Sequence, residues 1–146
     1  MRALALGFCL ALGVAATPVR ADTALPFKVV AHPDVPVNAV SKEFLAHIYL
    51  RSRNRWTDGE KTKPVDNAGL RAIFAKVILD RDLDDLKAFW DQQVFAGKGV
   101  PPPEKPTDKE VATYIAANPG AVGYLSANVK VVGLKELKVT GVGEDK

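Results

Sequence analysis

The sequence is 146 residues long, and 47% of its residues are hydrophobic, 25% charged and 8% aromatic. These proportions are ordinary for a soluble globular protein and exclude collagen-like, coiled-coil and wholly disordered chains. The formal charge of +3, from 20 basic and 17 acidic side chains, is too small and too mixed to indicate a nucleic-acid partner. A single cysteine excludes a disulfide framework and a zinc ribbon.

The first 21 residues are typical of a secretory signal peptide. A positive start and the uncharged run 3–16 are followed by Val19 and Ala21, which match the small-residue pattern of a signal-peptidase site. The uncharged run is shorter than the roughly 20 residues that a membrane-spanning helix needs. We expect cleavage after Ala21, which removes the only cysteine and two arginines. The mature domain, residues 22–146, is then soluble, and periplasmic or otherwise secreted.

The elements expected next alternate between strand and helix. Residues 27–31 are apolar and rich in β-branched side chains, so they predict a buried strand, and an extended link over residues 35–40 follows. Apolar side chains within residues 44–49 recur at helical spacing, and Ser41 is placed to cap that helix. The polar segment 51–63 predicts a turn region whose tryptophan folds back on the core.

An edge strand and two helices are expected in the middle of the chain. Residues 63–66 predict a short strand, which Pro64 restricts to a strand start or a sheet edge. Within residues 70–78, apolar side chains at positions i, i+3, i+4, i+7 and i+8 predict one amphipathic helix. A further helix is expected from Asp82. Its expected inward face consists of Leu83, Leu86, Phe89 and Trp90.

The C-terminal third predicts one helix and three strands. Residues 96–103 are rich in glycine and proline and form neither a helix nor a central strand. Thr107 and Glu110 have the spacing of a capping box and begin a helix. The strands are expected at residues 121–125, 129–132 and 137–142. Helices alternating with short strands predict one α/β domain, with a mixed sheet flanked by helices.

Catalytic and metal-binding patterns are scarce. None of the three serines after the leader lies in a nucleophile elbow, and the two histidines have no partner at metal-ligand spacing. The acidic run 80–85 lacks the glycine and the closing glutamate of a calcium loop. No phosphate-binding or dinucleotide-binding glycine motif occurs. We therefore expect neither an enzyme nor a protein that holds a metal or a cofactor.

One segment, residues 66–71, has features of an anion site. It lies where a strand passes into a helix, and the unpaired N–H groups of a helix N-terminus attract anions. Gly69 would let a ligand approach the backbone, and Arg71 could add forked donors. Under the alternative interpretation, Asn67 only caps the helix and Arg71 is solvated. Spacing alone leaves both interpretations open.

Four segments resemble, in order, the phosphate-binding proteins of ABC transporters. They are V-V-A-H-P-D-V-P-V at 29–37, the helix and R-W-T-D-G of 41–59, F-A-G-K-G with its prolines at 95–103, and N-P-G-A-V-G-Y at 118–124. The likeness covers about residues 27–132. It implies a single lobe of the type 2 periplasmic-binding-protein fold. It also implies a small anion such as phosphate as ligand and an ABC transporter as partner. The candidate binding residues are those of the strand-to-helix segment, Asn67, Gly69 and Arg71, of which Gly69 and Arg71 resemble the family.

Two differences from that family leave a second function open. Its receptors have two lobes, whereas the mature chain supplies about one, and the hydroxyl side chains of its phosphate loop are missing from residues 65–71. The first hypothesis is an exported solute-binding-like protein. The alternative is a one-lobed periplasmic interaction module that has lost ligand binding and binds another protein. Whether two chains pair as a homodimer to rebuild a cleft also stays open.

Overall fold

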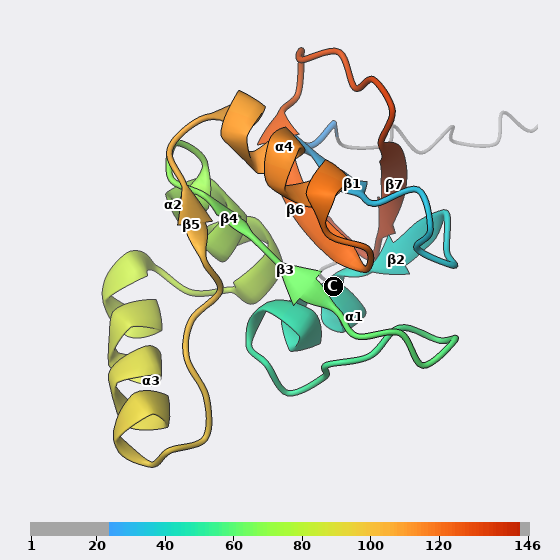
Figure 1. The fold of residues 1–146 in the computed structure, drawn as a ribbon. Coiled ribbons are helices and arrows are strands. Elements are labelled where there is room, and N and C mark those ends of the chain that lie inside the picture. Colours follow the sequence, from blue (N-terminus) through green and yellow to red (C-terminus); the bar gives the residue numbers. More distant parts are fainter. Residues whose placement is uncertain (1–23, 144–146) are drawn as a thin grey trace, which may run out of the picture.

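The computed structural model describes residues 24–143, so the expected signal peptide lies outside the described residues. Figure 1 shows the elements along the chain. They are β1 (Phe27–Ala31), β2 (Ala39–Ser41), α1 (Lys42–Tyr49), β3 (Lys63–Pro64), β4 (Asp66–Asn67), α2 (Arg71–Phe74), the π-helical turn η1 (Ala75–Leu79), α3 (Leu83–Phe95), β5 (Glu104–Lys105), α4 (Asp108–Ala117), β6 (Ala121–Ser126) and β7 (Lys135–Thr140). Among these residues, no helix is both long enough and apolar enough to cross a membrane.

A five-stranded mixed sheet in the order β2-β7-β1-β6-β3 forms the centre of the domain. Strand β1 runs antiparallel to both β6 and β7, while the outer strands β2 and β3 pair in parallel with β7 and β6. The expected strand at 27–31 is thus confirmed, and the strand containing Pro64 lies at the sheet edge. The predicted α/β class with a mixed sheet flanked by helices is also confirmed.

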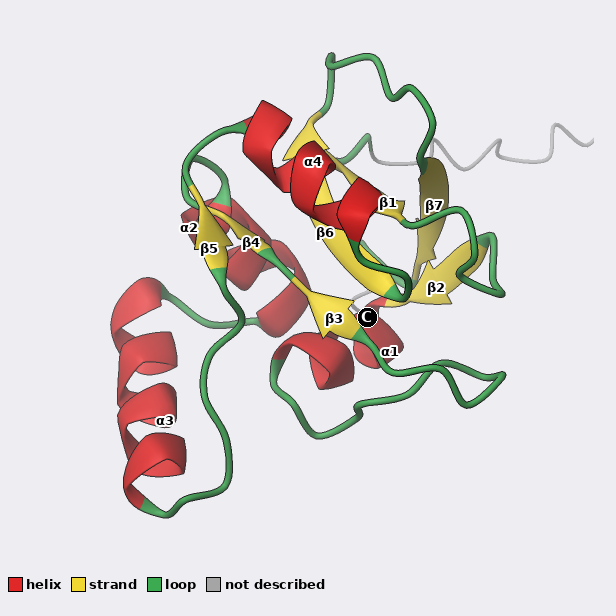
Figure 2. Cartoon of the chain, viewed as in Figure 1, coloured by secondary structure: helices red, strands yellow, loops and turns green. Residues whose placement is uncertain are grey.

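Each face of the sheet packs against its own helices (Figure 2). Alternate residues of β1 point to opposite faces, and both faces are buried, as expected for strands covered on two sides. Helix α1 and the α2–η1 segment cover one face; their core includes Val29, Leu45, Phe74, Ile78 and Tyr124. Helix α4 covers the other face; its core includes Val30, Val65, Val111, Ile115 and Leu125.

Side-chain caps begin three of the helices where the sequence predicts them. The Ser41 hydroxyl accepts a hydrogen bond from the Phe44 N–H (3.1 Å). Asp82 accepts one from the Asp85 N–H (2.8 Å), and Thr107 accepts one at the start of α4. Since each cap satisfies a donor that the helix leaves unpaired, these starts follow from local sequence.

Three sequence-based predictions need correction. Residues 129–132 form a loop instead of a strand, because both sides of β6 and of β1 are already occupied by other strands. The helix predicted over 70–78 begins at Arg71 and continues as the π-helical turn η1. Four members of the expected apolar stripe still pack in or against the core, but Ile73 is exposed. Leu83 of α3 is exposed as well, although the pattern places it inward.

A second, two-stranded ladder lies beside the main sheet and positions the candidate site (Figure 1). Strands β4 and β5 pair in parallel, with Asp66 opposite Glu104 and Asn67 opposite Lys105. The Asp66 N–H donates to the Pro103 carbonyl (2.8 Å), and the Ala68 N–H donates to the Lys105 carbonyl (3.0 Å). This ladder brings the start of α2 against a segment that follows α3.

Candidate anion-binding site

Asn67 is buried, and its side-chain amide bonds to other parts of the protein. Its Nδ2 group donates to the Asp108 carboxylate (2.7 Å) and to the Tyr124 carbonyl (3.1 Å), while its Oδ1 atom accepts from the Gly69 N–H (3.2 Å). Burial alone would raise the pKa of Asp108, but hydrogen bonds from Ser126 and Asn67 hold it below its ordinary value. Asn67 therefore fixes the turn between β4 and α2.

The helix that follows this turn starts without a capping side chain. Its N-cap residue is Leu70, which offers no side-chain acceptor. The first N–H groups of a helix have no partner within the helix, so those of the first turn, beginning at Arg71, are open to an external acceptor. Gly69 leaves room beside them, because a Cβ atom there would meet only Asn67 Oδ1, at 3.6 Å.

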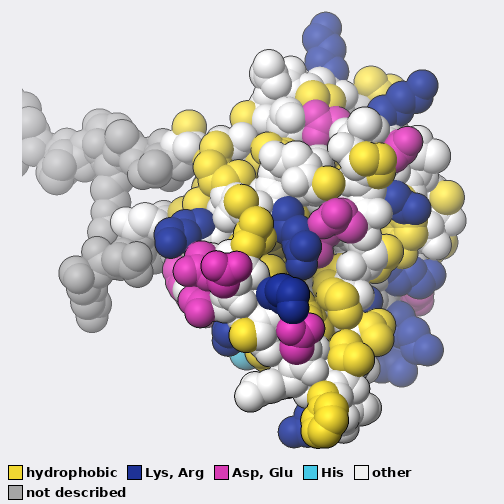
Figure 3. Space-filling model, turned by 90° about the vertical axis from the view of Figure 1, so that its left-hand side faces the viewer, with side chains coloured by type: hydrophobic (Ala, Val, Ile, Leu, Met, Phe, Trp, Pro, Cys, Tyr) yellow, Lys and Arg dark blue, Asp and Glu magenta, His cyan; other side chains and the backbone are white. Residues whose placement is uncertain are grey.

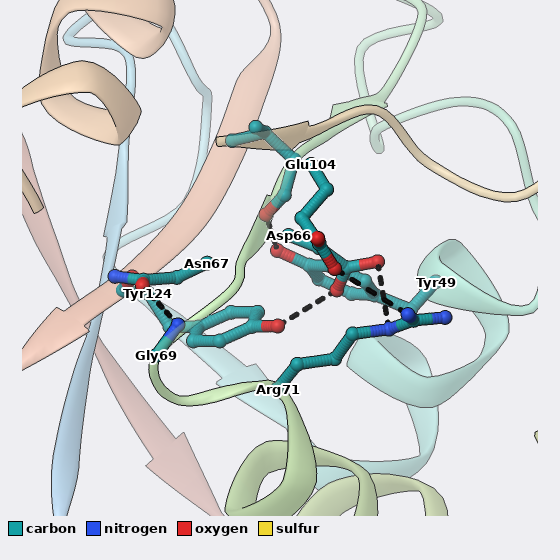
Figure 4. Close-up of polar contacts among 8 residues, drawn as sticks. Tyr49, Asp66, Asn67, Gly69, Arg71, Glu104 and Tyr124 are labelled. Carbon is teal, nitrogen blue, oxygen red and sulfur yellow. Dashed lines mark hydrogen bonds and ion pairs between the residues drawn. The ribbon is translucent and has the colours of Figure 1, made fainter. Parts of the chain in front are cut away.

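Arg71 lies between two carboxylates from different strands (Figure 4). Its Nη1 group donates to Glu104 Oε2 at 3.4 Å, and its Nε atom lies 3.9 Å from Asp66 Oδ2. That Nε atom is buried and makes no hydrogen bond. The two carboxylates thus compensate the charge of the guanidinium, but not all of its N–H groups donate a hydrogen bond.

Asp66 is the buried acid of the site. The Tyr124 hydroxyl donates to its Oδ1 atom at 2.7 Å. Burial raises the pKa of Asp66 to about 6, although the hydrogen bond from Tyr124 and the charge of Arg71 act in the opposite direction. Glu104 adds to the increase through like-charge repulsion. Asp66 therefore changes its charge close to neutral pH.

Aromatic rings hold Tyr124 in place beneath Asp66. The Phe74 ring stacks on the Tyr124 ring with a centroid separation of 3.9 Å and an interplanar angle of 3°. The neighbouring Tyr49 hydroxyl donates to the carbonyls of Val65 (2.9 Å) and Val122 (3.2 Å). Burial raises the pKa of both tyrosines, so both remain neutral donors.

Solved structures share this arrangement of elements, although no protein-family model matches the sequence. A Clostridium perfringens protein, described as a phosphate ABC transporter substrate-binding protein and solved with bound phosphate, superposes with a TM-score of 0.63 at 17% identity. It covers 80% of this chain, which spans 46% of that protein. The chain shares the fold of about half of this phosphate-binding protein. This confirms the resemblance of the four sequence segments at the level of the fold.

Two further structures have the same phosphate-binding-protein fold. A phosphate transport receptor of Vibrio cholerae matches with a TM-score of 0.61 at 17% identity, and it covers 78% of this chain. PstS of Borrelia burgdorferi matches with a TM-score of 0.58 at 13% identity. This chain spans 46% and 47% of their lengths, respectively. Its phosphate-binding-protein fold therefore corresponds to less than half of the chains it matches, consistent with a single lobe.

The structure brings together the three residues that the sequence singles out, but gives them different environments. Asn67 and Gly69 shape the turn, and only Arg71 presents a charged donor. Glu104, which the sequence reasoning missed, completes the polar cluster. No local pattern marks Glu104, because it reaches Arg71 only through a ladder of two-residue strands.

We expect Asp66 to make the stability of the protein depend on pH. Its folded pKa of about 6 lies above the ordinary 3.8, so the folded state binds more protons between about pH 4 and 6. The associated stability is present below that window and is lost as the pH rises through it. The loss amounts to about 3 kcal/mol.

Urea unfolding of the wild type and of Asp66→Asn across this window measures the effect. Asparagine keeps an acceptor for Tyr124 but cannot ionise, so the difference in unfolding free energy between the two proteins should shift in favour of the variant as the pH rises. Asp108 titrates in both proteins and cancels in that difference. Parallel pH profiles for the two proteins would show that Asp66 is not the titrating group.

Proposed function

We propose that this chain is an exported, single-lobed solute-binding protein that binds phosphate or another small oxyanion at the start of α2. The observation that carries the proposal is Arg71, placed at the uncapped N-terminus of α2 beside the buried acid Asp66. The fold supports it, because a neighbour with this fold was solved with bound phosphate. The proposed binding residues are Asn67, Gly69 and Arg71, with Asn67 acting by holding the turn.

The chemistry of these groups favours a protonated oxyanion. Arg71 and the first N–H groups of α2 are donors suited to oxygen atoms that carry negative charge. Asp66 would repel a fully ionised ligand, but its carboxylate can accept a hydrogen bond from a ligand that still carries a proton. Hydrogen phosphate satisfies both requirements, whereas sulfate at neutral pH has no proton to donate.

The remaining parts of the proposal concern place and partners. The leader-like sequence before residue 22 supports export to the periplasm, and the named neighbours are substrate-binding proteins, which supports a role without catalysis. The same neighbours support an ABC transporter as partner. These assignments can be tested separately from ligand binding, by cell fractionation and by cross-linking.

Arg71→Ala is expected to weaken phosphate binding by about tenfold or more, since a hydrogen bond to a charged group contributes about 1.5–3 kcal/mol. Titration calorimetry with residues 22–146 and inorganic phosphate measures the affinity. Arg55→Ala is the matched control, because it removes an exposed arginine that donates to the Gly59 carbonyl. Absence of heat with millimolar phosphate would rule out the proposed ligand. Unchanged affinity with a much lower melting temperature would make Arg71 structural.

A second candidate function is a protein-interaction module. Exposed apolar side chains gather on α3 and the loop after it, and Figure 3 shows this face with hydrophobic and charged groups intermixed. They are Leu83, Val94, Phe95 and Val100. Phe95 is 96% exposed, which is unusual for a ring of this size. A chain that binds no phosphate but sediments as a dimer, or cross-links to one periplasmic protein, would favour this function.

A further inference from the structure

Glu104 is directed at the same guanidinium that the proposed ligand needs. Residues paired across a parallel ladder point to the same side, so the register of Asp66 with Glu104 places both carboxylates toward Arg71 (Figure 4). The Glu104 Oε2 atom lies 3.4 Å from Arg71 Nη1 and accepts a hydrogen bond from it. The geometry therefore places a carboxylate of the protein at the donor edge of Arg71.

The backbone of Glu104 is fixed, but its side chain can move. Two hydrogen bonds, to the Pro103 and Lys105 carbonyls on either side of it, hold β5 against β4. The Glu104 side chain is 44% exposed, so its carboxylate can turn into water without moving the strand. A negative group on a fixed backbone can therefore either pair with Arg71 or leave it.

The charge of Arg71 is already compensated by two carboxylates before a ligand arrives. When Asp66 and Glu104 are both ionised, the three groups together carry one net negative charge, which opposes the approach of an anion. The Asp66 side chain is only 9% exposed and accepts a hydrogen bond from Tyr124, so it cannot withdraw. Glu104 is the carboxylate that has to give way.

We propose that Glu104 is a built-in competitor for the oxyanion. Its carboxylate accepts from the Nη1 group of Arg71, and it must swing into solvent before an anion can bind at that group. This inference rests on the proposed function, since it assigns the regulation of the same site. Glu104 lowers the affinity of the site for the anion below that of an unpaired Arg71 guanidinium. It also compensates the charge of Arg71 when no anion is bound.

Calorimetric titration with inorganic phosphate tests the competition in the wild type and in three variants. Glu104→Gln should bind phosphate about fivefold more tightly, the size expected from removing one partly exposed ion pair. Glu104→Asp keeps the charge but shortens the reach, so it should also bind more tightly, by a smaller factor. Glu60→Gln removes an exposed carboxylate from the turn before β3 and should leave the affinity unchanged.

A second measurement tests the contact between Glu104 and Arg71 in the absence of any anion. Phenylglyoxal reacts with accessible guanidinium groups, and mass spectrometry of peptides gives the rate at Arg71. The rate should rise in Glu104→Gln and remain at the wild-type value in Glu60→Gln. Urea unfolding of each variant confirms that it is folded.

The outcomes separate this inference from the function on which it rests. If the wild type binds phosphate and Glu104→Gln binds it equally well, Glu104 has no role in binding. If the variant binds more weakly, Glu104 is a positioning residue. In either case the competitor role is wrong, while the proposed function stands. If neither protein binds phosphate, the proposed function is wrong and the competitor role falls with it. Tighter binding by both Glu104 variants, with faster modification of Arg71, supports the competitor role.

Discussion

Gly120→Ala is expected to lower the free energy of unfolding by about 4 kcal/mol, near the upper end for a single substitution. Gly120 has a φ angle of +83°, which side chains rarely adopt, and a Cβ atom there would collide with the Lys61 carbonyl oxygen. The Gly120 carbonyl also accepts hydrogen bonds from the Trp56 indole (2.9 Å) and the Lys63 N–H (3.1 Å). The backbone therefore cannot shift to make room without losing both bonds.

Urea unfolding measures this loss, and Gly59→Ala is the matched control. Gly59 has a φ angle of +91°, but a Cβ atom there would meet nothing within 4 Å. The control thus carries only the conformational cost of a positive φ, about 1–2 kcal/mol. Equal losses at the two positions would contradict a rigid approach between the start of β6 and the loop before β3.

Phe74→Ala is expected to cost about 3–5 kcal/mol, the range for a large buried ring replaced by alanine. The Phe74 side chain lies in the centre of the aromatic cluster, stacked on Tyr124 and 4.6 Å in centroid distance from Tyr49. The variant should also loosen Tyr124, whose hydroxyl donates to Asp66. The core and the candidate site are therefore coupled through one ring.

The exposed ring of Phe95 supplies the control for this prediction. Phe95→Ala removes the same atoms from a position outside the core and should change the unfolding free energy by less than about 0.5 kcal/mol. Thermal or urea unfolding of the two variants gives the comparison. A loss below about 1.5 kcal/mol in Phe74→Ala would show that the cluster repacks easily around the missing ring.

Local signals in the sequence predicted the parts of the fold that local physics determines. Ser41, Asp82 and Thr107 each bond to an N–H only three residues away, so their helix starts are visible without the rest of the chain. The strand at residues 27–31 is apolar at every position except Lys28, and this pattern predicts that the strand is buried. Residues 129–132 are similarly apolar, but whether they form a strand depends on which sheet edges remain free to pair with them.

The candidate site could be predicted only in part, for the same reason. Residues 66–71 are recognisable in the sequence because a strand, a glycine and an arginine follow one another there. Strands β4 and β5 are each two residues long and give no periodic signal. The second carboxylate beside Arg71, and the aromatic support below Asp66, both come from distant segments. The charge balance of the site is therefore a property of the tertiary structure.

The pairing of the central strand also constrains how the chain folds. Strand β1 comes first along the described chain, yet its two neighbours, β6 and β7, come last. Contacts between such distant segments are slow to form, because a long loop must close before they contribute stability. Until β6 has been synthesised, β1 has no partner in the central sheet. This order delays completion of the core until nearly the whole polypeptide is available. If the chain is exported as proposed, the delay favours delivery across a membrane before folding.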